Sequence, residues 1–341
     1  MTINGQNIST RSSLPDFMKG AAVILMIQVH LVELFAEEAI YNSGLGKFLL
    51  FLGGPPAAPL FMVVMGYFLA ESKKTTSQNI LRGLKLFLVG ILLNAGINLH
   101  LFVKIIFGEI QVDPLPYLLG VDILPLAGLS IIIISVIKKI FRDKIFLYLI
   151  FLLVVILSSD FLYQSTDAEK PIAYIQAFFW GQFNWSYFPV FPWLVYPLVG
   201  FIISVVMSKS TIDERNLFHF SVPASIVSVA TISYGINTAA NLKVYYHHNW
   251  IYIFWTLQFL IVITYLSYQL VLQCDENKIV RYLKWLGRNV TLAYIMQWLI
   301  IGYFATSLFR SQNEIMLLFW FVLIVASVSL LTSLFKSKKI F

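Results

Sequence analysis

The chain has 341 residues, of which 59% are hydrophobic and only 12% are charged, and its mean hydropathy is +0.79. Soluble domains average about 45–50% apolar and about 25% charged residues, so this composition excludes an ordinary soluble globular protein. The formal net charge of +7 comes from 24 basic and 17 acidic residues. The basic residues are spread along the chain and form no single patch, so we expect no nucleic acid as a partner.

Apolar stretches long enough to cross a membrane recur from one end of the chain to the other. A spanning helix needs about 20 mostly apolar residues. The stretches are apolar throughout and do not alternate with polar residues, which indicates helices and excludes the strands of a membrane barrel. The predicted fold class is therefore an all-α polytopic membrane protein, a bundle of about ten transmembrane helices. The expected spans are 17–36, 47–70, 80–99, 116–137, 145–161, 188–207, 217–236, 250–273, 284–306 and 314–335.

The basic residues predict the orientation of this bundle, because lysine and arginine accumulate in cytoplasmic loops. With these ten spans, 19 of the 24 basic residues fall on one side of the membrane and 5 on the other. Both termini lie on the basic side, so we expect both to be cytoplasmic. Residues 1–341 are expected to form a single transmembrane domain, with a polar cytoplasmic N-terminus at 1–15 and a basic cytoplasmic tail at 336–341.

The N-terminal segment, residues 1–15, is polar and lacks the apolar core and the cleavage site of a signal peptide. We therefore expect the first span to stay in the protein and to direct its insertion, as a multi-pass protein of the plasma membrane. The one cysteine, Cys274, lies in an expected cytoplasmic loop and has no second cysteine with which to form an internal disulfide.

Three ionisable side chains are expected inside the membrane, where such groups are costly and usually face a protein interior or a wet cavity. His30 lies toward the outer end of the first span, and Glu33 follows one helical turn later on the same face. Asp122 lies at a similar depth in the fourth span. Imidazole titrates near neutrality and a neighbouring carboxylate can fix its tautomer, so His30 and Asp122 together suit general base catalysis. The alternative is a buried histidine that hydrogen-bonds a neighbouring helix and only stabilises packing.

Residues 53–56, Gly-Gly-Pro-Pro, are expected to break the second helix. A broken helix inside a membrane is tolerated where its free backbone groups line a cavity or meet protein, so the sequence predicts a cavity beside the outer half of the bundle. Asn94, Asn98 and Gln297 can hydrogen-bond across helices or line a polar path, and packing is the more frequent role.

Aromatic and histidine side chains gather in two expected outer segments. Trp185 and Trp193 belong to an aromatic stretch before the sixth span, which suits either a wall that stacks against sugar or an interfacial belt. His247 and His248 lie in an outer loop, where they either contact a substrate or are solvated. We take these four residues as candidate substrate-binding residues.

Four segments carry motifs whose order along the chain is itself informative. They are 14–20 (LPDFMKG) followed by the histidine at 30, 58–67 (APLFMVVMGY) followed by 82–85 (RGLK), 188–194 (FPVFPWL), and 286–298 (LGRNVTLAYIMQW). In this order they resemble the acyltransferase-3-like superfamily of transmembrane acyltransferases, most of all the branch that contains heparan-α-glucosaminide N-acetyltransferase and bacterial relatives. The most specific match is 188–194, which is similar to the family's Phe-Pro-x-Phe-Pro-Trp signature.

The chain departs from the pattern of this family at three positions. Lys19 stands where the opening motif has arginine, and Pro125 and Gln297 stand where many relatives have histidine. These departures leave open a catalytically inactive relative.

The resemblance implies transfer of an acyl group, usually acetyl from acetyl-CoA, to a hydroxyl or amine of an extracytoplasmic sugar or glycolipid. It implies His30 as general base on the acceptor, with Asp122 or Glu33 as orienting partner. The acceptor would attack the thioester directly, or an acyl-histidine would form first. We expect no metal. Membrane lipids are the other expected partners, and a homodimer through lipid-facing spans is compatible with the sequence.

The phosphates of the donor need cations, and several lie at the expected cytoplasmic ends of core spans. The candidate donor-binding residues are Lys19, Arg82, Lys85, Arg288 and Asn289. A transporter or flippase of a lipid-linked sugar is the competing function, because it would also show broken helices and intramembrane polar residues. Against it, no repeat relates the two halves of the chain, and the intramembrane charges gather toward the outer face.

Overall fold

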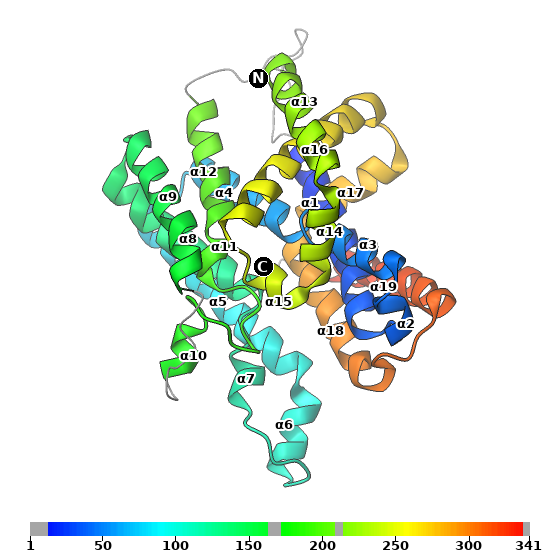
Figure 1. Ribbon diagram of the computed structural model, residues 1–341. Coiled ribbons are helices and arrows are strands. Elements are labelled where there is room, and N and C mark those ends of the chain that lie inside the picture. Colours follow the sequence, from blue (N-terminus) through cyan, green and yellow to red (C-terminus); the bar gives the residue numbers. More distant parts are fainter. Residues whose placement is uncertain (1–12, 163–171, 209–213, 337–341) are drawn as a thin grey trace.

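The computed structural model describes residues 13–162, 172–208 and 214–336. Over these residues the chain is helical and contains no strand, apart from two isolated bridges between single residues. Nine helical segments of the described part are long and apolar enough to cross a membrane, and one further pair, bent by 66°, passes the same test together. The expected all-α bundle of about ten membrane helices is therefore confirmed, with nine to ten candidate spans in the described residues, and Figure 1 shows their arrangement.

The helices and their bounds are as follows in chain order. They are α1 (Ser13–Leu34), α2 (Glu38–Tyr41), α3 (Gly44–Gly53), α4 (Ala58–Glu71), α5 (Thr76–Ile97), α6 (Leu99–Ile106), α7 (Leu115–Leu118), α8 (Ile123–Phe141), α9 (Ile145–Leu162), α10 (Ile172–Gln176), α11 (Val190–Trp193), α12 (Val195–Met207), α13 (Glu214–Ala230), α14 (Ile232–Ala240), α15 (Leu242–Tyr246), α16 (Trp250–Cys274), α17 (Lys278–Arg288), α18 (Val290–Leu308) and α19 (Glu314–Lys336).

Helix α1 is the element around which the site is built. It packs against α3, α4 and the four helices α16 to α19. Its buried residues run from Asp16 near one end to Val32 near the other. Both ends of α1 are therefore surrounded by protein, and each end carries one of the polar sites described below.

The second span is broken where the sequence predicts. Helix α3 ends at Gly53 and α4 begins at Ala58, and a turn with two prolines lies between them. At this break Gly53 approaches α1 so closely that an added Cβ atom would lie 2.1 Å from Cβ of Val29. The turn therefore lies directly beside the half of α1 that carries His30.

The seventh expected span, 217–236, is a bent pair of helices and not one straight helix. Helices α13 and α14 meet at Thr231. The Thr231 hydroxyl donates to the Val227 carbonyl at 2.6 Å and accepts from the Trp255 indole N–H at 2.9 Å. A threonine that bonds the carbonyl four residues earlier bends a helix, and the bond from α16 fixes this bend against a neighbouring helix.

Helices α1 and α17 cross in backbone contact. A Cβ atom added to Gly20 would lie 1.9 Å from the Leu283 carbonyl oxygen, and one added to Gly287 would lie 1.8 Å from the Asp16 carbonyl oxygen. Small residues allow such an approach in a membrane, where packing drives helix association. The crossing brings the start of α1 next to the end of α17.

We predict that Gly287→Ala separates α1 from α17 and lowers the thermal stability of the protein. Overpacking a tight contact costs about 1–3 kcal/mol, and the added methyl group meets backbone, which cannot rotate away. The measurement is the apparent melting temperature in detergent, followed by size-exclusion chromatography. Gly44→Ala is the matched control, because a Cβ atom at Gly44 meets nothing within 4 Å. Equal melting temperatures for Gly287→Ala and the wild type would contradict the crossing.

Candidate active site

A cavity of about 1070 Å³ lies at the end of the bundle where α1 carries His30. Residues of the broken second span, Gly53 to Ala58, border it, as the sequence predicts. The cavity brings His30 and Glu33 of α1 together with Asp122, which lies at the start of α8 and far away in the sequence. Its polar and aromatic lining includes His30, Glu33, Asn94, Asp122, Trp185, Tyr187, Tyr246, Tyr294 and Trp298.

The imidazole of His30 packs against an aromatic ring of α18. Its centroid lies 4.1 Å from that of Trp298, with 38° between the ring planes. Among the described residues its Nδ1 has no hydrogen-bond partner, although this atom is shielded from solvent. His30 therefore lines the cavity with an unused nitrogen, which is what a group that takes a proton from a bound molecule requires.

Asp122 has partners other than the histidine expected for it. Its Oδ1 accepts from the Ile123 N–H at 2.7 Å and so caps α8, and its Oδ2 accepts from the Tyr294 hydroxyl at 2.5 Å. In the described part of the chain no hydrogen bond joins Asp122 to His30. Asp122 instead fixes Tyr294, which lies one helical turn before Trp298, the residue that packs on His30.

Glu33 lies one helical turn beyond His30. The Tyr246 hydroxyl is 3.5 Å from its Oε1, at the long limit of a hydrogen bond. The end of α1 is held by the loop after α18, because the Arg310 N–H donates to the Leu34 carbonyl at 3.0 Å. This bond fixes where α1 presents the carboxylate.

Asn94 of α5 and Asn98, directly after this helix, hold the loop that carries Asp122. The amide of Asn94 donates to the Gly120 carbonyl at 2.8 Å, and that of Asn98 donates to the Tyr117 carbonyl at 3.3 Å. Both side-chain amides donate hydrogen bonds to backbone carbonyls of this loop. They therefore stabilise helix and loop packing, the role that the sequence predicts as the more frequent one. The position of Asp122 thus depends on α5 as well as on α8.

Trp185 lines the cavity, as expected of a residue that contacts a ligand there. Its carbonyl accepts from the Val121 N–H at 2.7 Å, which ties this loop to the one that carries Asp122. Its ring packs on Tyr174 and Phe183, with centroids 5.4 and 5.1 Å away. The indole N–H of Trp185 has no partner in the described residues and can donate to a ligand.

Trp193, His247 and His248 do not line the cavity, in contrast to the sequence prediction. Trp193 is 0% exposed, and its indole N–H donates to the Tyr246 carbonyl at 2.8 Å. His248 is also buried, with Nδ1 2.7 Å from the Tyr245 carbonyl. Trp193 and His248 are buried in the aromatic core behind the cavity, so they support the backbone that presents Tyr246.

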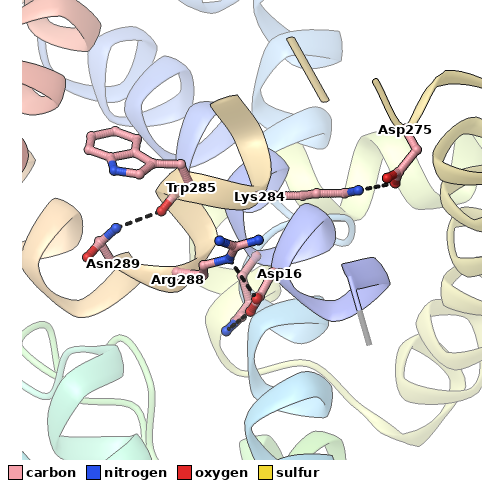
Figure 2. Close-up of polar contacts among 7 residues, drawn as sticks. Asp16, Asp275, Lys284, Trp285, Arg288 and Asn289 are labelled. Atoms are coloured by element: carbon pink, nitrogen blue, oxygen red, sulfur yellow. Dashed lines mark hydrogen bonds and ion pairs between the residues drawn. The ribbon is translucent and has the colours of Figure 1, made fainter. Parts of the chain in front are cut away.

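At the opposite end of α1, a buried carboxylate pairs with two cations (Figure 2). Asp16 Oδ1 lies 2.9 Å from the Lys19 ammonium, and Asp16 Oδ2 lies 3.4 Å from Nε of Arg288. The Lys19 side chain is 8% exposed and that of Arg288 is 56% exposed. Lys19 was expected to bind donor phosphate, but its ammonium is buried against Asp16. Arg288 also pairs with Asp16 and stays accessible. The spacing of Asp16 and Lys19, three residues apart on one helix, is the signal for this pair.

The other expected donor-binding residues have different surroundings. The amide of Asn289 donates to the Trp285 carbonyl at 2.7 Å and so closes the end of α17 (Figure 2). Arg82 and Lys85 are exposed near the start of α5. The accessible cations of this set are therefore Arg82, Lys85 and Arg288.

We predict that His248 makes the stability of the protein depend on pH. Burial lowers the pKa of His248 from 6.5 to about 4. Between these values the unfolded chain binds more protons than the folded one, so stability falls as the pH drops from about 6.5 to about 4. The contribution lost between pH 7 and pH 5 is about 2 kcal/mol.

The measurement is the melting temperature at pH 7 and at pH 5. We expect a larger fall for the wild type than for His248→Gln. His219→Gln, at an exposed histidine, is the matched control and should keep the fall of the wild type. An equal fall in the wild type and His248→Gln would contradict the prediction.

Comparisons with known proteins place the chain in a family. The family described as "Heparan-alpha-glucosaminide N-acetyltransferase, catalytic" matches residues 11–248, which include His30, Glu33, Asp122 and the signature at 188–194. Comparison with curated proteins and with solved structures gives no match. Since the family match covers more than half of the 341 residues, the chain belongs to the heparan-alpha-glucosaminide N-acetyltransferase-like catalytic domain family.

Proposed function

We propose that this protein is a membrane-embedded acyltransferase that moves an acetyl group from cytoplasmic acetyl-CoA to a hydroxyl or amine of an extracytoplasmic glycan or glycoconjugate. The observation that carries the proposal is the cavity in which a ring nitrogen of His30 has no partner among the described residues and lies beside Glu33 and Asp122. Membership of a family named for an N-acetyltransferase supports the type of reaction.

In the proposed reaction His30 acts on the acceptor. The acceptor oxygen or nitrogen loses its proton to the imidazole and attacks the carbonyl carbon of the thioester. The new C–O or C–N bond forms as the C–S bond breaks, and CoA leaves as a thiol with the proton from the imidazolium. The packing of Trp298 on the imidazole restricts the orientation of the ring.

The donor would bind at the other end of α1. Of the candidate donor-binding residues, Arg82, Lys85 and Arg288 are accessible, and arginine suits phosphate because its guanidinium can form paired hydrogen bonds. From Lys19 to His30 the helix rises by about 16 Å, a distance that an extended pantetheine arm can bridge. The thioester would then reach His30 without passage of CoA through the membrane.

The orientation of the protein in the membrane is part of the same proposal. With the ten expected spans, nineteen of the 24 basic residues fall on the side that holds both termini, and this asymmetry favours a cytoplasmic location for that side. The accessible cations would then face cytoplasmic acetyl-CoA, and the cavity with His30 would lie toward the outer face of the plasma membrane.

We expect His30→Ala to slow transfer by about 10²–10⁴-fold, the usual contribution of a general base. The measurement is release of the CoA thiol from acetyl-CoA by protein in liposomes, with a panel of amino sugars and neutral glycans as acceptors. His219→Ala is the control at an exposed histidine. Full turnover by His30→Ala would contradict the proposed base. Absence of turnover in the wild type, together with intact acetyl-CoA binding, would identify an inactive relative.

Rapid-quench labelling with radioactive acetyl-CoA separates direct attack from an acyl-histidine. Direct attack leaves no label on the protein. Label that is sensitive to hydroxylamine and is lost in His30→Ala would identify the covalent route.

We expect Arg82→Ala/Arg288→Ala to weaken acetyl-CoA binding by about tenfold or more, because a hydrogen bond to a charged group contributes about 1.5–3 kcal/mol. The measurement is calorimetry on the purified protein. Arg281→Ala is the matched control, an exposed cation of α17 that lies 4.0 Å from Glu276. Arg82→Ala alone leaves the pair of Asp16 and Arg288 intact and separates loss of binding from loss of folding. Unchanged affinity in the double variant would exclude this donor site.

A further inference from the structure

Helices α5 and α6 present one continuous apolar stripe to the outside of the bundle. Asn98 joins them, because its N–H donates to the Asn94 carbonyl at 3.1 Å and its carbonyl accepts from the Phe102 N–H at 3.0 Å. Exposed apolar side chains follow one face of this helical path at intervals of three, four or seven residues. They are Leu81, Leu84, Leu88, Leu92, Leu99, Val103 and Ile106.

The rise along α5 and α6 can be compared with the thickness of the hydrocarbon layer of a bilayer. From Lys85 to Ile97 the helix rises over 12 residues, about 18 Å. We take Lys85 as the inner edge of the hydrocarbon. Even if its ammonium snorkels about 5 Å toward the start of α5, the part of α5 from Lys85 onward covers less than the hydrocarbon thickness of about 30 Å. From Lys85 to Ile106 the rise is about 32 Å. With this edge, helix α6, which continues α5 away from the bundle (Figure 1), lies within the bilayer.

Helix α6 separates the cavity from lipid by the thickness of one helix. No residue of α6 is buried. The apolar stripe covers its outer face, where Leu99 is 62% exposed and Ile106 is 79% exposed. On its other face, His100, Leu101 and Lys104 line the cavity. The outer face of α6 thus contacts the acyl chains of the lipid, and its inner face lines the proposed acceptor site.

One side-chain contact between described residues crosses the seam between α6 and α18, where His100 Nε2 and Thr306 Oγ1 lie 3.2 Å apart. Beside Thr306 on α18, the small side chain of Ala305 lines the cavity, whereas Gly302 packs against Ile97 of α5. Tyr303, on the outer face of the same helix, is 74% exposed.

We propose that the acceptor is a lipid-linked sugar of the leaflet next to α6, and that its saccharide enters the cavity between α6 and α18. The proposal rests on the proposed function and names the class of its acceptor. An amphiphile is the occupant whose chemistry matches both faces of α6. Its hydrocarbon chain lies against the apolar stripe, and its polar head meets Asn98, His100 and Lys104. If a phosphate joins the sugar to the lipid, Lys104 supplies a cation for it.

The experiment compares two photoreactive sugars that differ only in their lipid. The first is hexadecyl β-glucoside with a diazirine on the glucose, in phosphatidylcholine liposomes that contain the protein, and the second is the methyl β-glucoside with the same diazirine. After irradiation, mass spectrometry measures the label on the peptides that carry His30, Tyr246 and Trp298. We expect the hexadecyl probe to label these peptides, and the methyl probe to label them about tenfold less or not at all.

Two tryptophan substitutions on α18 test the route. Ala305→Trp fills the seam and should lower cavity labelling by the hexadecyl probe about tenfold. Tyr303→Trp adds bulk on the lipid face of the same helix and should leave the labelling unchanged. Equal labelling by both probes, unchanged labelling in Ala305→Trp, or no cavity labelling by the hexadecyl probe would each overturn the proposal. The experiment contains no acetyl-CoA, so such a result leaves the proposed transfer reaction to its own test, the release of CoA.

Discussion

The backbone contact of α1 with α17 is the constraint on which both polar sites depend. Gly20 and Gly287 let the two helices touch, and this contact places Asp16 within reach of Arg288. Because α1 is a rigid rod, the same contact sets where its other end stands in the bundle. The histidine at that end and the cations at this end are thus held at a fixed separation. In the proposed function, this separation would set the distance between the donor phosphates and the base.

The carboxylates of the site are placed by neutral donors and not by the histidine. In a membrane an unpaired carboxylate is costly, and Asp122 is stabilised by the Tyr294 hydroxyl and by the first N–H of α8. In the part of the chain that the structure describes, no carboxylate bonds to His30, and its ring packs against Trp298. The separation of His30 from the carboxylates has a chemical advantage. A histidine that is not paired with a carboxylate keeps its nitrogen available for the proton of a substrate.

Composition and local backbone chemistry predict the fold of this protein well. The helical class, the spans and the break in the second span follow because apolar length and proline act locally. Matching depth in two spans also predicts the shared cavity of His30 and Asp122. The partners of these residues are not predictable in the same way. Tyr294 and Trp298 reach them only through the rotation of α18 about its axis, which results from packing with distant helices. Burial of Trp193 behind the cavity has the same origin, since an aromatic residue near an interface carries no local signal of the side it faces.

The hydrogen bonds of the cavity divide its residues by role. Groups that hold the loops, such as the amide of Asn94 and the carboxylate of Asp122, have short bonds to protein. Nδ1 of His30 and the indole N–H of Trp185 have none among the described residues. An unmade hydrogen bond of a buried group costs about 1–3 kcal/mol, so a ligand that bonds to these atoms would stabilise the site. Sugars carry hydrogen-bonding groups around the whole ring. The two atoms therefore favour a polar ligand beside His30, and an apolar molecule in the same cavity would leave their cost in place.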